Sequence, residues 1–228
     1  MQKKFYLIIL MAIVLSSCAH IGTIKSDINQ PEFQAENLPI RELRVWVYYE
    51  DYCQINKAVT NLNKLSDLME AQVGIRLNMT KYTPVEWESI GLLSRIEQMY
   101  DINNSTDFDI AIGFGHLTGP EAFMMLLGMP MAFGMIDDTY RRFITLKTME
   151  TEITLHEIYH SVILNHAHSL TGVMPALDFK IFPGLPSLNM GNYLTKADRE
   201  EVLRNKWRDF STKVLISEEY QRDIVGSK

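Results

Sequence analysis

The stretch LRVWVYYEDYCQINKAVTNLNKLSDLMEAQVGIRLNMTKY, residues 43–82, decides the fold because it predicts a strand, a helix and a second strand. Residues 43–49 are mostly β-branched or aromatic, which favours a strand. Residues 54–73 repeat apolar side chains at the spacing of one helix face, and Gly74 ends the helix. Residues 75–82 alternate between apolar and polar side chains, as strands do. Such a unit implies a right-handed crossover between parallel strands.

The rest of the chain continues this alternation of strands and helices. The further predicted elements are a helix at 90–100, a central strand at 108–114, a long loop at 113–128, an irregular edge strand at 129–136, a strand at 141–147, and helices at 149–164 and 195–210. Thr195 and Asp198 predict a capping box for the last helix. The predicted fold class is therefore α+β, with a mixed, mostly parallel, twisted sheet, packed helices and a small C-terminal helical subdomain.

The composition indicates one folded domain and excludes a nucleic-acid-binding protein. Of the 228 residues, 46% are apolar and 22% are charged, so the chain can supply a core. Its net charge of -6 leaves no basic surface for a phosphate backbone. We expect a monomer whose folded domain covers 42–215, with a tether at 18–41 before it and a tail at 216–228 after it.

The N-terminus is typical of an export signal. Lys3 and Lys4 precede an apolar run that is too short to span a membrane, where about 20 apolar residues are needed. The run ends in LSSC at 15–18, which resembles the lipobox of bacterial lipoproteins. This resemblance implies removal of 1–17, lipidation of Cys18 and a protein anchored to a membrane of the bacterial cell envelope. An ordinary cleaved signal with a chance cysteine is the alternative.

Cys53 is the second of the two cysteines in the chain. If Cys18 is lipidated, Cys53 has no disulfide partner within the chain. It lies near the start of the first predicted helix, where a free thiol most often packs as a small apolar side chain. We therefore expect Cys53 in the core.

Four of the six histidines lie in HEIYHSVILNHAH, residues 156–168. On the predicted helix, His156 and His160 project from one face, so both imidazoles can bind one metal ion at about 2.0–2.1 Å. Glu157 lies one position further round and can accept a proton from a water bound to that ion. A metal lowers the pKa of such a water to roughly 7. The pattern therefore predicts hydrolysis by a metal-activated water, as in metalloproteases.

A catalytic zinc ion needs a third protein ligand, and the sequence offers His166 and His168. On a continued helix, His166 would lie roughly 80° away from the face of His156. His166 can bind the same ion only if the helix ends before it and the chain turns back.

The segment 156–166 resembles the zinc motif of the metzincin peptidases, in which a third histidine follows the second by six residues. Met174 follows His166 by eight residues, as the Met-turn does in matrixins, although packing in the core is the simpler role for a methionine. The LNH at 164–166 is similar to the sequence that leads into the third matrixin ligand. The LTKAD at 194–198 also resembles the start of the last matrixin helix.

This resemblance covers about 42–210 and implies a metzincin-like fold and a zinc-dependent endopeptidase. Within it, His156, His160 and His166 match the zinc ligands, and Glu157 matches the catalytic base. The implied cofactor is Zn²⁺, and the implied substrate is a protein or peptide. An extended substrate would lie along the predicted edge strand by β-addition.

Ile163 occupies the position of the glycine in the metzincin motif. That glycine adopts a left-handed conformation as the chain leaves the helix, which costs a β-branched residue roughly 1–2 kcal/mol or more. We therefore expect a different turn here. Asn165 tolerates left-handed geometry better than most residues, and a reversal shifted by two positions would bring His168 to the metal in place of His166.

Two other functions are compatible with the sequence. If the Ile163 change relaxed the site, the chain is a catalytically inactive lipoprotein that binds zinc or a protein partner. Alternatively, Glu200 or Glu201 on the last helix supplies the third ligand, as in gluzincin-type peptidases. We place two residues outside the site: His116, as a surface residue of the predicted loop, and Tyr193, as a packing residue.

Overall fold

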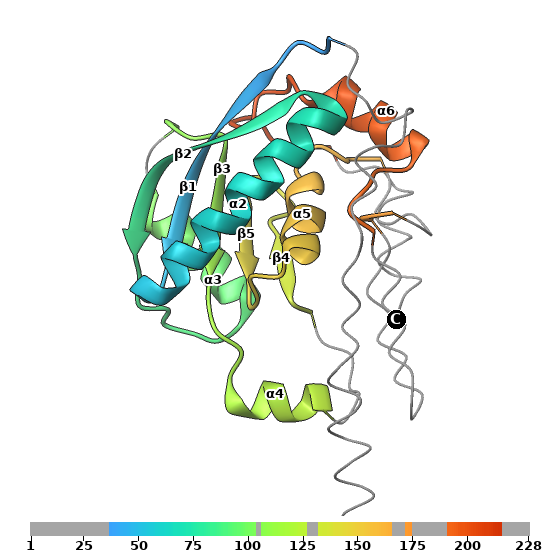
Figure 1. Ribbon diagram of the computed structural model, residues 1–228. Coiled ribbons are helices and arrows are strands. Elements are labelled where there is room, and N and C mark those ends of the chain that lie inside the picture. The colour runs from blue at the N-terminus through green and yellow to red at the C-terminus, as the bar shows by residue number, and fades with distance from the viewer. Residues whose placement is uncertain (1–36, 104–105, 127–131, 166–171, 175–190, 216–228) are drawn as a thin grey trace, which may run out of the picture.

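The computed structural model (Figure 1) describes residues 37–103, 106–126, 132–165, 172–174 and 191–215. The predicted signal segment, Cys18 and the predicted tail lie outside these residues. Cys53 lies in a described helix, but its side chain is outside the described part of the structure. Its place in the core stays a prediction.

A five-stranded sheet forms the centre of the described fold. Its strands are β1 (Arg41–Tyr49), β2 (Ile75–Pro84), β3 (Ile110–Phe114), β4 (Gly134–Ile136) and β5 (Phe143–Leu146). Their order is β2-β1-β3-β5-β4, and every neighbouring pair is parallel except β4 with β5. The predicted mixed, mostly parallel sheet is confirmed, with β3 at its centre and β4 at one edge.

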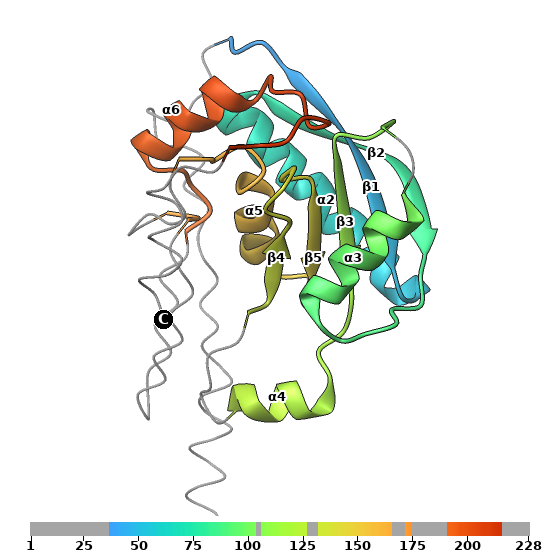
Figure 2. The same cartoon turned by 180° about the vertical axis from the view of Figure 1, so that it is seen from behind.

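Helices cover both faces of this sheet (Figures 1 and 2). They are α2 (Tyr52–Val73), α3 (Leu92–Ile102), α4 (Gly119–Leu126), α5 (Thr151–Tyr159) and α6 (Lys196–Asn205). The α2 and α5 helices share one apolar core with the sheet, and α3 packs on the opposite face. The α6 helix lies near the end of α2, and α4 projects beyond the sheet. None of the described helices is both long and apolar enough to cross a membrane.

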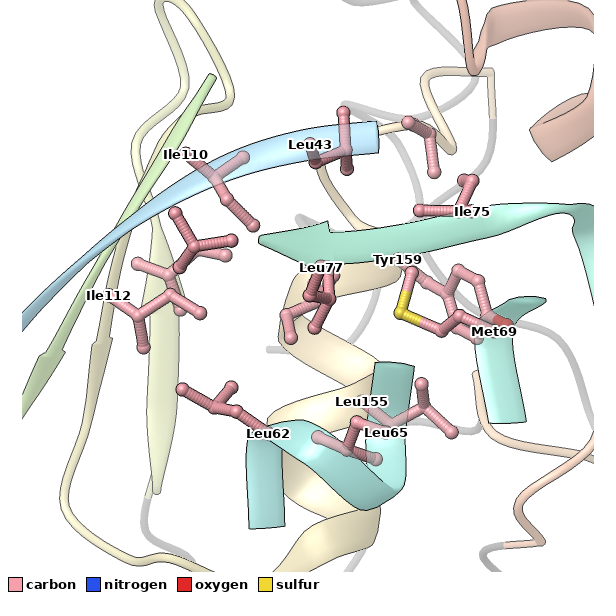
Figure 3. Close-up of a cluster of buried hydrophobic side chains, with 14 of the residues drawn as sticks. Leu43, Leu62, Leu65, Met69, Ile75, Leu77, Ile110, Ile112, Leu155 and Tyr159 are labelled. Atoms are coloured by element: carbon pink, nitrogen blue, oxygen red, sulfur yellow. The ribbon is translucent and has the colours of Figure 1, made fainter. Parts of the chain in front are cut away.

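The alternation of side chains along β1 explains why both faces of the sheet are covered. Val45 and Val47 join the core under α2 and α5, whereas Tyr48 packs toward α3 on the other face. In the larger core, Leu62 of α2 and Leu155 of α5 are completely buried (Figure 3). Burial of each such side chain contributes about 1.5–3 kcal/mol. This core holds α5, and the residues that it carries, firmly against the sheet.

The predicted long loop at 113–128 is partly wrong, because α4 lies within it. A capping box starts this helix: Glu121 N donates to Thr118 Oγ1 at 3.4 Å, and Thr118 N donates to Glu121 Oε2 at 2.9 Å. Pro120 is also well suited to the first turn of a helix. The T-x-x-E pattern was a sequence signal for this helix, and the neighbouring Gly119 and Pro120 concealed it by suggesting a loop.

Three predicted elements extend more than two residues beyond the observed ones. The edge strand covers only Gly134–Ile136, and part of its predicted range lies outside the described residues. The helix predicted to reach residue 164 ends at Tyr159, and the last helix ends at Asn205 rather than near 210. After α5, the carbonyl groups of Ser161 and Val162 accept hydrogen bonds from side chains of the C-terminal segment. For the other predicted helices and strands, the observed ends lie within two residues of the predicted ends.

The predicted capping box at the start of α6 is confirmed. Asp198 N donates to Thr195 Oγ1 at 3.2 Å, and Thr195 N donates to Asp198 Oδ2 at 3.3 Å. A cap of this kind contributes about 1 kcal/mol. After the helix, Lys206 Nζ donates to the carbonyl oxygens of Pro39 and Val73 at 2.8 and 2.9 Å. These contacts fasten the C-terminal segment to the end of α2, and a separate C-terminal subdomain stays a prediction.

Candidate metal centre

The two predicted histidine ligands lie together at the C-terminal end of α5. His156 and His160 each have 5% of their surface exposed, and their Nε2 atoms are 3.0 Å apart. Their rings are nearly perpendicular, with an angle of 88° between the planes. Two nitrogen ligands of one tetrahedral zinc ion lie about 3.3 Å apart. Both imidazoles are therefore placed so that one ion can bind them.

A backbone carbonyl fixes the orientation of His156. Its Nδ1 lies 2.8 Å from the carbonyl oxygen of Val173, and because a carbonyl only accepts hydrogen bonds, Nδ1 carries the proton. This leaves Nε2 as the metal-binding nitrogen, the usual arrangement for a histidine ligand. Val173 is held in turn, because its N donates to the carbonyl oxygen of Tyr193 at 2.8 Å.

Met174 follows this carbonyl and is completely buried in the larger core. Two residues before it, Gly172 has a φ of +83°, and a Cβ there would lie 2.6 Å from the carbonyl oxygen of Tyr193. Only glycine fits both the positive φ and the close approach. The backbone on either side of Val173 is thus fixed, which keeps its carbonyl group directed at His156.

Among the residues that the structure describes, no group of three or more His, Cys, Asp or Glu side chains is arranged to hold a metal ion. The two imidazoles supply two ligands, and both His166 and its alternative His168 lie outside the described residues. Two buried imidazoles suit zinc, whereas calcium and magnesium prefer oxygen ligands. The residues present therefore fit a zinc ion, and the third ligand stays a prediction.

Glu200 and Glu201, the alternative third ligands, differ in their exposure to solvent. Glu200 is exposed on α6. Glu201 is 5% exposed, and its Oε1 accepts hydrogen bonds from the backbone N atoms of Leu164 and Asn165 at 2.5 and 2.7 Å. Glu201 therefore binds the chain that leaves α5.

Glu157 is also buried, with 8% of its surface exposed. Burial raises the pKa of its carboxyl group to about 8, and the positive charge of Arg141 opposes this rise. The metal-free chain therefore holds a proton on Glu157 at neutral pH. A cation bound at the neighbouring imidazoles would favour the charged carboxylate.

The edge strand β4 passes directly beside Glu157. A Cβ added at Gly134 would lie 2.5 Å from both Cγ and Oε1 of Glu157. The φ of Gly134 is not positive, so the position requires the absence of a side chain and not an unusual backbone conformation. Because Gly134 has no side chain, the carboxylate of Glu157 can lie against the strand.

The chain leaves α5 without the left-handed turn of the metzincin motif. Ile163 is completely buried, and neither Ile163 nor Asn165 has a positive φ. The expectation of a different turn is confirmed, but a left-handed Asn165 is not part of it. Instead, Asn205 Nδ2 donates to the carbonyl oxygen of Val162 at 2.9 Å. The described exit from α5 is thus held partly by a side chain from the end of α6.

Several of these contacts were missed by the sequence reasoning. Val173 acts through its carbonyl group, which no side-chain pattern marks, and Arg141 lies in a turn far from α5 in sequence. Gly134 did carry a signal, because a glycine inside a strand often marks the close approach of another group. His116 is exposed as predicted, and its Nε2 lies 3.2 Å from Asp51 Oδ2.

No protein-family model matches the sequence, and no curated protein is significantly similar to it. The fold is similar to part of a chain in the structure of a chaperone-substrate complex, with a TM-score of 0.52 and 10% sequence identity. That match covers 77% of this chain and 35% of the other. This chain thus spans much less than two thirds of that protein, and the similarity concerns the fold alone.

Two further similar structures are those of an archaemetzincin and of a zinc-dependent peptidase. An archaemetzincin from Methanopyrus kandleri matches with a TM-score of 0.46 and 14% identity, over 73% of this chain and 97% of its own. A zinc-dependent peptidase from Methanocorpusculum labreanum matches with a TM-score of 0.38 and 13% identity, over 69% and 99% of the two chains. Both TM-scores are below 0.5, so the function proposed below rests on the geometry of the site.

Proposed function

We propose that this chain is a zinc-dependent endopeptidase with His156, His160 and His166 as its zinc ligands. The observation that carries the proposal is the buried pair of Nε2 atoms of His156 and His160, 3.0 Å apart. Without a metal, one Nε2–H can donate to the other Nε2 at this distance, and a cation that replaces this proton would bind both lone pairs. The metzincin-like spacing of the sequence supports His166 as the third ligand.

In this proposal Glu157 is the catalytic base. Zinc, when bound, supplies the Lewis acid that polarises the scissile carbonyl and activates a water. Glu157 accepts the proton of the attacking water and passes it to the leaving amine. Arg141 assists because its charge favours the carboxylate form of Glu157. The Val173 carbonyl keeps His156 in the tautomer that binds metal.

The substrate is an extended peptide that adds to the outer edge of β4. This strand is last in the sheet order, and among the described strands it pairs only with β5. Backbone hydrogen bonds to such an edge hold a peptide independently of most of its side chains. Because Gly134 lies against Glu157, a peptide bound there presents its backbone close to the base.

Metal analysis and a peptide-library digest of the soluble form that begins after Cys18 test this function. We expect one zinc ion per chain, cleavage within peptides, loss of cleavage on chelation and its recovery when zinc is restored. His160→Ala should remove the zinc, because one of the two observed imidazoles is lost. Bound zinc without cleavage of any peptide would support the inactive zinc-binding lipoprotein instead, and a metal-free wild-type chain would contradict the site itself.

We also propose that the mature protein is attached to a membrane of the bacterial cell envelope through lipidated Cys18. The LSSC sequence at 15–18 supports this. Cys18→Ser should move the protein from the membrane fraction to the soluble fraction, as measured by cell fractionation, whereas Cys53→Ser should leave it with the membranes. A Cys18→Ser protein that stays in the membrane fraction would exclude this anchor.

A further inference from the structure

We infer that Glu201, Asn205 and Arg208 form a clasp that replaces the glycine turn of the zinc motif and positions the chain leading to the third metal ligand. We call these three residues the α6 clasp. The inference rests on the proposed zinc site. It goes beyond that site because it assigns a positioning role to residues that the metal does not contact.

The α6 clasp binds backbone groups of four residues in the chain after α5. Arg208 Nε donates to the carbonyl oxygen of Ser161 at 2.8 Å. Asn205 Nδ2 donates to the carbonyl oxygen of Val162 at 2.9 Å. The two backbone N–H groups bound by Glu201 follow directly, at positions 164 and 165. The clasp therefore supplies donors to the carbonyl groups of Ser161 and Val162 and an acceptor to the N–H groups of Leu164 and Asn165.

Two of these three side chains, Glu201 and Arg208, are ionisable, and their contacts with the chain after α5 are partly buried. Hydrogen bonds to an ionised group are roughly twice as strong as those between neutral partners. A single oxygen of Glu201 accepts both N–H groups, so Leu164 and Asn165 must point toward the same place. Glu201 thus fixes the last two described residues before His166 in the sequence.

Arg208 links this exit to the region beside Glu157. Its Nη2 donates to the carbonyl oxygens of Tyr140 and Arg141 at 2.6 and 2.9 Å, in addition to its contact with Ser161. Burial lowers the pKa of Arg208 to about 10, so its guanidinium group is still charged at neutral pH. The Arg208 side chain thus fixes the end of α5 relative to the turn that carries Arg141.

The position of Ile163 explains why a clasp is needed. Its β-branched side chain disfavours a left-handed conformation, and its φ is not positive, so the chain leaves α5 without a left-handed residue at this point. The carbonyl and N–H groups freed at the end of the helix then need partners from elsewhere. The side chains of the α6 clasp provide these partners.

Zinc affinity and the visible spectrum of the cobalt-substituted full chain test this inference. Glu201→Ala leaves the N–H groups of Leu164 and Asn165 without this acceptor, and Glu201→Gln keeps the shape but removes the charge. We expect zinc affinity to fall on the order of 10- to 100-fold for Glu201→Ala and less for Glu201→Gln, as for other residues that orient metal ligands. The cobalt spectrum should change, because the third ligand is no longer held in place. Glu200→Gln, an exposed neighbour on the same helix, should match the wild type in both measurements.

The possible outcomes separate the clasp from the proposed function. If the wild type binds no zinc, the proposed function fails and the clasp fails with it. If the wild type binds zinc and Glu201→Gln has the same affinity and cobalt spectrum, the clasp alone is overturned, even where Glu201→Ala does not fold. If a chain without His166 and His168 keeps its zinc while Glu201→Gln loses it, Glu201 is a metal ligand and the clasp is again overturned.

Discussion

Glu157→Gln should lower the kcat of peptide hydrolysis by about 10²–10⁴-fold while the zinc content stays unchanged. Glutamine has nearly the same size as glutamate, so it can occupy the buried place beside Gly134. It cannot accept a proton from the attacking water. The two imidazoles and the Val173 carbonyl do not depend on the charge of Glu157, so the metal should remain bound. The measurements are kcat on a cleaved library peptide and zinc per chain.

Glu152→Gln is the matched control for this experiment. Glu152 lies in the first turn of the same helix and is only partly buried, so its replacement should leave kcat and zinc content as in the wild type. Full peptidase activity in Glu157→Gln would remove Glu157 from its proposed role. Loss of zinc together with activity would make Glu157 a part of the metal site rather than the base.

The layers of the fold could be predicted because they follow from local periodicity. Residues 43–49 show the two-residue period that places Val45 and Tyr48 on opposite faces of the sheet. Residues 54–73 show the helical period that buries Leu62. Both patterns are set by backbone geometry over a few residues, so they can be recognised from the local sequence alone.

The ends of α5 and α6 and the surroundings of the histidines could not be predicted in the same way. The spacing of His156 and His160 places them on one helix face, and the structure brings their Nε2 atoms together. The carbonyl of Val173, however, reaches His156 across 17 residues, and Glu201 reaches Leu164 across 37. Such contacts are set by tertiary packing, which the local pattern of residues does not encode.

Gly134→Ala should lower kcat by roughly 10²-fold, with zinc content and folding preserved. The added Cβ would lie 2.5 Å from Cγ and Oε1 of Glu157, far inside a normal contact, so one of the two groups has to move. The Glu157 side chain is flexible, whereas β4 is hydrogen-bonded to β5, so the carboxylate is the group that shifts. A displacement of about 1 Å at a catalytic group can cost on the order of 10²-fold in rate.

Two comparisons connect this loss to Glu157. Gly119→Ala adds a Cβ that meets no heavy atom within 4 Å, so its kcat and thermal stability should match the wild type. Glu157→Asp draws the carboxylate back by one methylene group, and Gly134→Ala should therefore cost less in that background than in the wild type. An equal loss in both backgrounds would show that Gly134 acts independently of Glu157, because independent sites contribute additively to the free energy of activation. Unequal losses would locate the effect in the contact between the edge strand and the base, which is where peptide binding and proton transfer have to meet.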